Sequence, residues 1–143
     1  MRSHSVSVAV GVVFDDDGRV LLARTTYGTR SIGPPGGRIE QGESPVAAAR
    51  REFKEETGFE VCVERLIGFY SFTDQDHETL VSAFLCSIVG GELQIPSDEI
   101  SEVVWSNPRN LPEPADLVGP LAIADALDHN WGVVREGLPW RPR

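Results

Sequence analysis

Residues 37–59, GRIEQGESPVAAARREFKEETGF, predict a helix whose two ends are both marked in the sequence. Ser44 is a favoured N-cap residue, and Pro45 suits the first helical position, where its missing N–H costs no hydrogen bond. Gly58 stands where helices commonly end in the left-handed conformation, so we expect the last helical residue near Thr57. Three apolar residues recur at helical spacing and predict the buried stripe: Val46, Ala49 and Phe53.

Three glutamates of this helix, Glu52, Glu55 and Glu56, fall within one arc of about 100° on a helical wheel. Like charges at these spacings repel each other, and near the C-terminus of a helix the macrodipole also disfavours anions. One interpretation is an ordinary solvated surface. The other is a bound cation, and oxygen ligands without a neighbouring His or Cys favour Mg²⁺ or Mn²⁺ over Zn²⁺.

Three further residues of the same stretch are placed to support such a site. Arg51 precedes Glu55 by four residues, within reach to orient its carboxylate. The loop before the helix can bring Glu43 close to the acidic face. Gly37 has no side chain to shield its backbone carbonyl, so this carbonyl can serve as a further ligand.

Outside this helix, apolar runs alternate with turn-rich segments. We expect strands at residues 5–14, 19–24, 61–72, 79–89 and 100–105. Turns are expected at residues 15–18, as a hairpin, and at residues 90–91, while the polar residues 73–78 separate two of the strands. The Gly- and Pro-rich residues 25–42 are expected to hold neither helix nor regular strand. A second helix is expected at residues 117–129 and an irregular tail from about residue 130.

Length and composition exclude several classes of protein. The chain has 143 residues, 41% of them hydrophobic and 24% charged, with a formal net charge of -9. These values exclude a disordered chain and predict one α/β domain, residues 1–143, around a mixed sheet. The acidic balance argues against a nucleic acid polymer as partner, and no apolar run predicts a membrane span. Cys62 and Cys86 lack metal-ligand spacing, and we expect a cytoplasmic protein.

The spacing within residues 37–59 resembles the signature of the Nudix hydrolases at every defined position. The matching residues are Gly37, Glu43, Arg51, Glu52, Glu55, Glu56 and Gly58, with apolar residues at 53 and 59. Weaker similarity extends to residues 20–24, 35–37 and 99–105. The resemblance implies an α/β/α sandwich around a mixed sheet. It also implies Mg²⁺- or Mn²⁺-dependent cleavage of a pyrophosphate linkage in a nucleoside diphosphate derivative.

The resemblance further implies roles for individual residues. Glu52, Glu55 and Glu56 would bind the metal together with the Gly37 carbonyl, and Glu52 is also a candidate general base. In the same way, Glu43 would support the site through hydrogen bonds or a second metal, while Arg51 would position a glutamate.

A further carboxylate outside the motif is often part of such sites. We expect it to be Glu99, with Glu102 as the alternative, although both also fit ordinary loop carboxylates. Three arginines flank the motif and can hold a distal phosphate, or can be solvated surface residues: Arg24, Arg30 and Arg38.

The substrate is less well defined by the sequence. Ile32 stands where many relatives have an aromatic residue, and residues 73–76 lack the subfamily markers of ADP-ribose and diadenosine polyphosphate enzymes. Three aromatic residues, Phe69, Tyr70 and Phe72, can stack on a base or form sheet core. Two tryptophans near the end of the sequence, Trp131 and Trp140, can cap a pocket or pack the tail.

Three functions are therefore compared. The first is a nucleoside triphosphate pyrophosphohydrolase that releases the monophosphate and pyrophosphate. The second is a pyrophosphatase acting on ADP-ribose or a nucleotide sugar. The third is a nucleotide-binding regulatory module without catalysis, which the intact motif glutamates disfavour. In each case we expect a small-molecule nucleotide as ligand and a monomer or homodimer.

Overall fold

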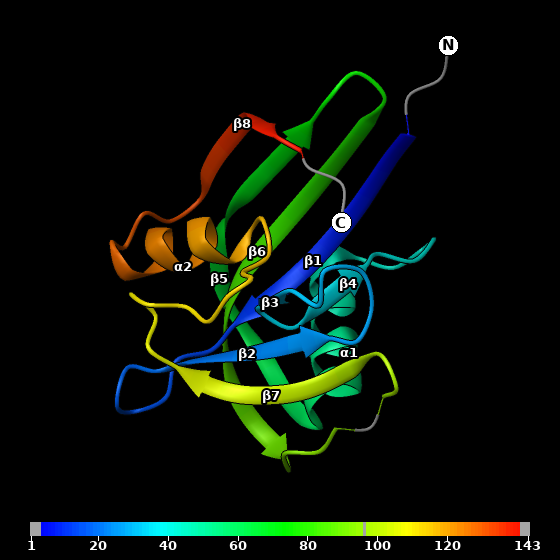
Figure 1. Cartoon of the computed structure of the whole chain (residues 1–143). Coiled ribbons are helices and arrows are strands. Elements are labelled where there is room, and N and C mark those ends of the chain that lie inside the picture. Colours follow the sequence, from blue (N-terminus) through cyan, green and yellow to red (C-terminus); the bar gives the residue numbers. More distant parts are fainter. Residues whose placement is uncertain (1–3, 96, 141–143) are drawn as a thin grey trace.

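A computed structural model describes residues 4–95 and 97–140, and in these residues the chain forms two sheets and two α-helices (Figure 1). The elements, in chain order, are β1 (His4–Val12), β2 (Val20–Thr25), β3 (Ile32–Gly33), β4 (Gly36–Arg38), α1 (Pro45–Thr57), β5 (Phe59–Thr73), β6 (His77–Gly91), β7 (Ile100–Ser106), α2 (Gly119–Leu127) and β8 (Val133–Pro139). The larger sheet has the order β4-β1-β6-β5-β8 and the smaller one β3-β2-β7. The larger sheet is mixed, because β1 pairs with β6 and β5 with β8 in parallel.

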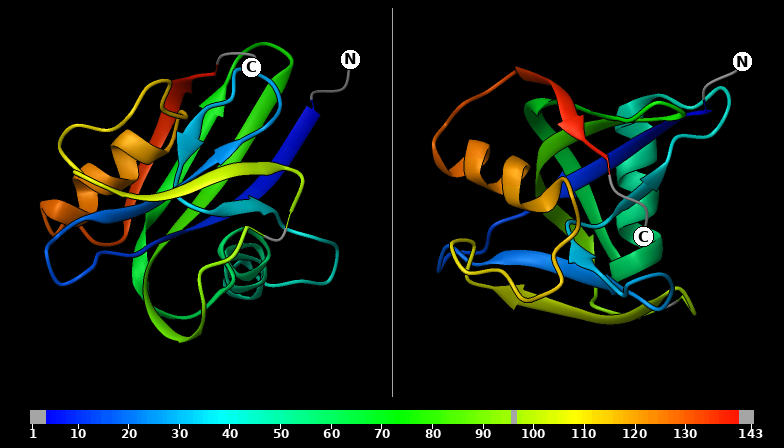
Figure 2. Two further views of the ribbon diagram at one scale, coloured as in Figure 1. Left: turned by 60° about the horizontal axis from the view of Figure 1, so that its bottom comes forward. Right: turned by 45° about the horizontal axis from the view of Figure 1, so that its top comes forward.

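The two helices cover opposite faces of the larger sheet, as the two views of Figure 2 show. Alternate residues of β1 point to opposite faces. Ala9 packs with Phe53 of α1 in one apolar cluster, whereas Val10 packs with Ile123 of α2 in the other. This arrangement confirms the predicted α/β fold with a helix on each side of a mixed sheet.

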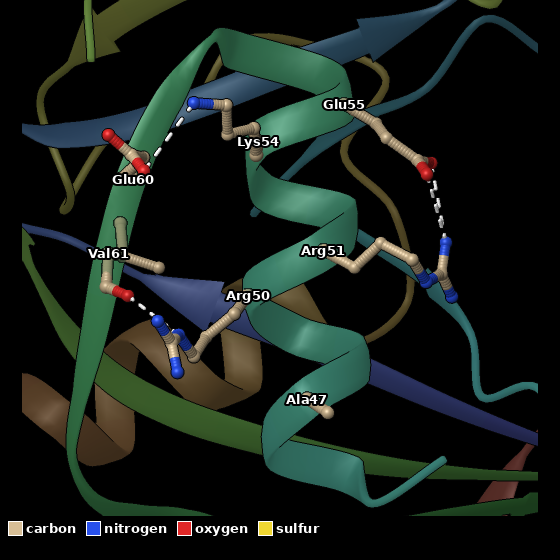
Figure 3. A pocket seen from close by; sticks show the side chains of 7 residues that line it. All are labelled: Ala47, Arg50, Arg51, Lys54, Glu55, Glu60 and Val61. Carbon is tan, nitrogen blue, oxygen red and sulfur yellow. Dashed lines mark hydrogen bonds and ion pairs between the residues drawn. The ribbon is translucent and has the colours of Figure 1, made fainter. Parts of the chain in front are cut away.

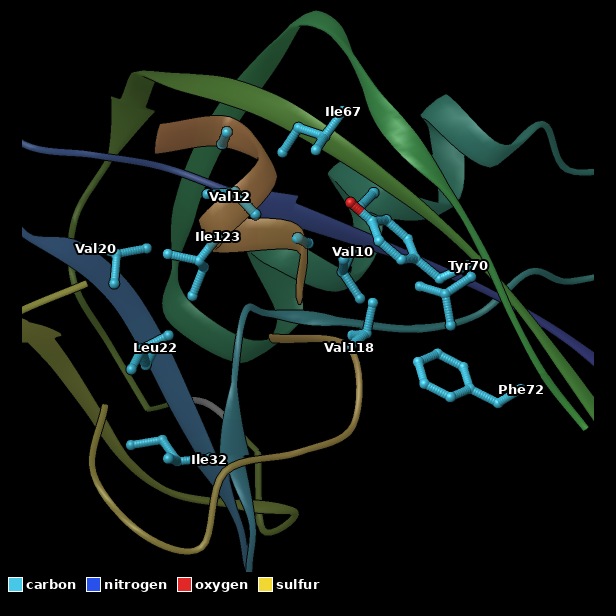
Figure 4. Close-up of a cluster of buried hydrophobic side chains, with 14 residues drawn as sticks. Val10, Val12, Val20, Leu22, Ile32, Ile67, Tyr70, Phe72, Val118 and Ile123 are labelled. Atoms are coloured by element: carbon cyan, nitrogen blue, oxygen red, sulfur yellow. The ribbon is translucent and has the colours of Figure 1, made fainter. Parts of the chain in front are cut away.

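Aromatic residues of β5 belong mainly to the core rather than to an open binding surface. Tyr70 and Phe72 lie in the cluster beneath α2, together with Ile67 of the same strand (Figure 4). Tyr70 is fully buried, whereas Phe69 points to the other side of the strand and is partly exposed. The alternation of a strand thus separates neighbouring aromatic residues into core and surface positions.

Helix α1 begins and ends where the sequence predicts. The Oγ of Ser44 accepts a hydrogen bond from the N–H of Ala47 at 3.0 Å, and Gly58 has a φ of 84°. The buried residues are Ala48, Ala49, Phe53 and Thr57, so the prediction that Val46 is buried was wrong. Val46 points almost the same way as Phe53 on the helical wheel. It is exposed because it lies in the first turn, at the end of the helix.

Three predictions about irregular segments were wrong. Residues 25–42 contain β3 and β4, which pair with β2 and β1 on either side of Pro34 and Pro35. Gly90 and Gly91 are not a turn but the end of β6, paired with Glu60 and Phe59. The tail contains β8, which adds to the edge of the larger sheet beside β5. β3, β4 and the end of β6 are short or glycine-rich, and each of these segments, like β8, is completed by a partner that is distant in sequence.

The turn predicted at residues 15–18 is confirmed, but the two strands that it joins belong to different sheets and do not form a hairpin. The N–H of Asp15 donates to the carbonyl of Arg19 at 2.8 Å, and Phe14 forms an antiparallel bridge with Val20. Beyond this bridge the strands separate, with β1 in the larger sheet and β2 in the smaller one. Helix α2 lies within the predicted residues 117–129 but is shorter at both ends. Neither helix of the described residues is long and apolar enough to cross a membrane.

Candidate active site

A cavity of about 680 Å³ lies between the smaller sheet, β4 and the C-terminal half of α1. Residues from separate segments meet there. Five of the predicted site residues are among those that line it: Gly37, Arg38, Glu52, Glu56 and Glu99. Packing of α1 against β1 and β4 sets the position of the two helix glutamates, and the start of β7 brings in Glu99.

Glu56 is the most deeply placed carboxylate of this group. One of its oxygens accepts a hydrogen bond from the N–H of Gly36 at 3.1 Å. Burial, together with the nearby carboxylates of Glu52, Glu99 and Glu55, raises the pKa of Glu56 to about 8 despite the opposing effect of the Gly36 hydrogen bond. The ionised form is therefore poorly compensated by the protein itself. A cation in the cavity would supply that compensation.

Glu52 lies directly against the backbone of β4. A Cβ atom on Gly37 would lie 2.5 Å from the Cδ atom of Glu52, so a side chain at position 37 would displace the carboxylate. Pairing of Gly37 with Ala9 of β1 holds this strand in place. Burial raises the pKa of Glu52, although the Arg51 guanidinium lowers it in part.

Arg51 links three acidic residues of the motif through one guanidinium. It donates to both oxygens of Glu43, at 2.7 and 3.0 Å, to Glu52 at 2.8 Å and to Glu55 at 3.3 Å. The hydrogen bonds from Arg51 hold the pKa of Glu43 at about 2, well below its usual value. The same partners raise the pKa of Arg51. The bidentate pair with Glu43 ties the loop before α1 to the helix.

Glu55 lies further out than Glu52 and Glu56. It points away from the outer face of α1 toward Arg51, while Arg50 and Lys54 turn toward β5 (Figure 3). Glu55 and Glu99 both line a neighbouring hollow of about 670 Å³. Glu99 therefore borders the spaces in front of both Glu56 and Glu55.

The donor set fits a hard divalent cation in its chemistry. The candidate ligands are carboxylates and a backbone carbonyl, which suit Mg²⁺ or Mn²⁺. Within residues 4–95 and 97–140, no three His, Cys, Asp or Glu side chains are already arranged around one metal position. Arg51 is close enough to Glu52 and Glu55 to balance part of their charge.

The two candidates for the further carboxylate occupy different places. Glu99 lines the cavity with Glu52 and Glu56. Glu102 lies on the β2–β7 pair, where it accepts a hydrogen bond from the Nε of Arg24 at 2.7 Å. The geometry therefore favours Glu99 over Glu102 as a site residue.

The three flanking arginines are also separated by the structure. Arg38 lines the cavity. Arg24 is held by Glu102 and by the carbonyls of Arg30 and Glu113, so it stabilises the smaller sheet and its adjoining loops. Arg30 has a φ of 52° and lies in the turn after Tyr27, outside the lining of the cavity in the residues described.

Tyr27 and Asp116 are among the cavity residues that the sequence did not single out. Tyr27 is 62% exposed, and Asp116 comes just before α2. Burial and the charges of Glu56 and Glu99 raise the pKa of Tyr27. Neither residue belongs to a motif, and only the folded arrangement places them beside the glutamates.

Comparison with known proteins agrees with this geometry. The sequence pattern of the NUDIX domain matches residues 4–125. The chain belongs to the Nudix family. It is a Nudix hydrolase, an enzyme of a family that acts on phosphoric anhydrides and generally uses a divalent metal ion.

Individual relatives show how far the likeness extends. A "MutT-like protein" of Streptomyces ambofaciens is 40% identical over 126 residues, covering 87% of this chain and 78% of the relative. An "ADP-ribose pyrophosphatase" of Methanocaldococcus jannaschii is 34% identical over 111 residues, covering 75% of this chain and 65% of the relative. A crystal structure of a "UDP-X diphosphatase" superposes with a TM-score of 0.76 at 22% identity, covering 94% of this chain and 68% of that one. The last likeness concerns the fold alone.

Proposed function

We propose that this Nudix hydrolase is a nucleoside triphosphate pyrophosphohydrolase, which converts an NTP or a modified dNTP into the monophosphate and pyrophosphate. The observation that carries the proposal is the shared cavity of Glu52, Glu56 and Glu99, with Gly37 in close contact. Such a group of poorly compensated carboxylates suits a metal-bound anionic substrate. A "Putative 8-oxo-dGTP diphosphatase" of Bacillus subtilis, 38% identical over 81 residues, supports this choice of substrate class.

Glu52, Glu55, Glu56 and the Gly37 carbonyl would hold the divalent cation, with Glu99 as a further ligand. When bound, Mg²⁺ or Mn²⁺ neutralises phosphate oxygens and lowers the pKa of a bound water. The net charge of -9 makes this role important, since the protein would otherwise repel its substrate.

In the reaction, a water oxygen forms a bond to one phosphorus of the anhydride, and the bond from that phosphorus to the bridging oxygen breaks. The water's proton passes to a carboxylate, for which Glu52 is our candidate, and the bridging oxygen leaves with the other product. Arg51 is a positioning residue, because it holds Glu43, Glu52 and Glu55 in fixed relation. Arg38 faces the same cavity and can bind a distal phosphate.

The second candidate is hydrolysis of ADP-ribose or a nucleotide sugar. The observation in its favour is the 34% identity to an ADP-ribose pyrophosphatase. The chemistry at the glutamates is the same for both candidates, and they differ in the group attached beyond the scissile linkage. The third candidate function is a nucleotide-binding module without catalysis, which is tested by measuring ligand binding rather than turnover.

The proposal is tested by product release from a panel of NTPs, modified dNTPs, ADP-ribose and nucleotide sugars with Mg²⁺ or Mn²⁺. Coupled assays report pyrophosphate and monophosphate separately. We expect Glu56→Gln to lower kcat at least about 100-fold without unfolding the protein. The matched control is Glu60→Gln, because Glu60 of β5 pairs with Lys54 and does not line the cavity of Glu52 and Glu56. Equal turnover by Glu56→Gln and wild type would overturn the assignment of Glu56.

A further inference from the structure

A second recess, of about 320 Å³, adjoins the cavity that holds Glu52 and Glu56. Five residues line both spaces: Val8, Tyr27, Ser31, Asp116 and Val118. Small-molecule sites commonly have volumes of about 300–1,000 Å³, so the recess is large enough for part of a ligand. A ligand whose phosphates lie at the carboxylates can therefore extend its other end into this recess.

The walls of the recess are suited to a flat aromatic group. Three aromatic side chains line it, and they come from three separate parts of the chain: Tyr27, Phe72 and Trp140. Aromatic rings bind one another by offset stacking or by edge-to-face contact. Asp116 and Ser31 add polar groups at the border with the larger cavity. This combination fits the base of a nucleotide better than a phosphate or a sugar.

Trp140 is held at the recess by contacts on its other side. Its ring is stacked on His77, with centroids 4.4 Å apart and planes within 1° of each other. One ring face is thus covered by His77, and the Trp140 side chain forms part of the lining of the recess. The backbone N–H of Trp140 donates to the backbone carbonyl of Thr73 at 3.4 Å, next to the pairing of Pro139 with Thr73.

The position of Trp140 depends on β8, which the family match does not include. That match ends at residue 125, whereas β8 spans Val133–Pro139. The guanidinium of Arg135 holds β8 to the carboxylate of Asp125 in α2. The wall that Trp140 contributes is therefore a feature of this chain beyond the matched domain.

We propose that Trp140 is a specificity-determining residue that stacks on the nucleobase of the substrate, with Tyr27 at the mouth of the recess. The inference rests on the proposed function, because it assumes that the ligand is a nucleotide with phosphates at Glu52 and Glu56. Recognition of the base would then come from a residue directly after β8, outside the residues that match the family.

The test measures binding rather than turnover. The probes are the non-hydrolysable α,β-methylene analogues of ATP and GTP, and inorganic tripolyphosphate as a ligand without a base, each titrated calorimetrically with Mg²⁺. We expect Trp140→Ala to weaken binding of both analogues about tenfold, as loss of base stacking does in other proteins. Binding of tripolyphosphate should stay unchanged, because it needs only the phosphate side of the site.

Two further variants separate stacking from packing. Trp140→Phe keeps an aromatic face and should restore most of the affinity, whereas Trp140→Leu keeps apolar bulk and should not. Trp131→Ala is the matched control, since Trp131 contacts His129 and Arg65 instead of the recess. Its affinity for the analogues should equal that of wild type. Thermal unfolding verifies that each variant is folded.

Several outcomes would overturn the inference. These are unchanged analogue binding in Trp140→Ala, an equal loss for tripolyphosphate, full affinity in Trp140→Leu, or the same loss in Trp131→Ala. Failure of the proposed function gives a different result, namely no hydrolysis of any nucleotide by wild type. Base-dependent binding through Trp140 is measured independently of that result.

Discussion

Gly36 and Gly37 are adjacent in β4, but the structure gives different reasons for the absence of a side chain at each. A Cβ on Gly36 would meet the backbone carbonyl of Ala9 in the neighbouring strand. A Cβ on Gly37 would meet the carboxylate of Glu52, at the flexible end of a side chain. Backbone atoms of a central strand cannot easily move, whereas a glutamate can rotate away.

We therefore expect Gly37→Ala to fold normally and to lose activity, because Glu52 must leave its position against β4. The expected loss in kcat is about tenfold or more, with little change in Tm. Gly36→Ala should instead lower Tm by several degrees, through strain in the β1–β4 pair. Thermal unfolding and initial rates on both variants check this. Equal behaviour of the two variants would contradict the assignment.

At the scale of the element, α1 combines an apolar face with a face of three glutamates. Ala49 and Phe53 pack against the sheet, and Glu56 is drawn close to the same core. Arg51 balances the charge nearer the start of the helix. Glu56 has no arginine partner in the contacts described, so the helix should resist ionisation of Glu56 when metal is absent.

This predicts a pH dependence of stability for the metal-free protein. The pKa of Glu56 rises from 4.5 to about 8 on folding. Its contribution to stability is complete below about pH 4.5 and is lost as the pH rises to about 8. We expect the free energy of unfolding in EDTA to fall over this range, by an amount on the order of a few kcal/mol.

Urea unfolding at several pH values in EDTA measures this slope. Glu56→Gln should flatten it, because the amide does not ionise, and Mg²⁺ should reduce it in wild type by binding the charged form. Glu60→Gln again serves as the control and should keep the wild-type slope. A Glu56→Gln protein with the full slope would show that another group is responsible.

At the scale of the whole molecule, a buried polar network joins elements that are far apart in sequence. Asp125 of α2 is 4% exposed, and its carboxylate accepts hydrogen bonds from the Tyr70 hydroxyl at 2.7 Å and from the Arg135 guanidinium. These contacts connect β5, α2 and β8. Arg135, followed by Tyr70, lowers the pKa of Asp125 against the effect of burial. The network therefore anchors β8, and with it Trp140, which follows β8 and lines the recess.

Tyr70→Phe tests this anchor with little change in volume. We expect it to lower the free energy of unfolding by about 1.5–3 kcal/mol, because a buried carboxylate loses one donor. Tyr27→Phe is the matched control, since Tyr27 is exposed and its substitution should leave stability unchanged. Urea unfolding of the two variants measures both values. A loss of stability as large in Tyr27→Phe would rule out the network as the cause.

Local information was enough to predict α1, the motif and the class of chemistry. Ser44, Pro45 and Gly58 act through the backbone next to them, so their effects are visible in the order of residues. The spacing of Glu52, Glu55 and Glu56 follows from the period of the helix. The long strands were equally predictable, because their apolar runs are continuous.

Contacts between distant segments decided the remaining features. The strands β3 and β4 have only two and three residues, mostly glycine, and exist because distant backbone groups pair with them. β8 begins with Val133 and Val134 but contains Gly137, and its place beside β5 is set by pairing with a distant strand. Glu99, just before β7, and Arg38, in β4, line the cavity, whereas Glu102 and Arg24 pair with each other across β7 and β2. These differences depend on how the two sheets come together. Tyr27, Asp116 and Trp140 meet at the recess only after the chain has folded, because no local pattern determines which loops lie together in space.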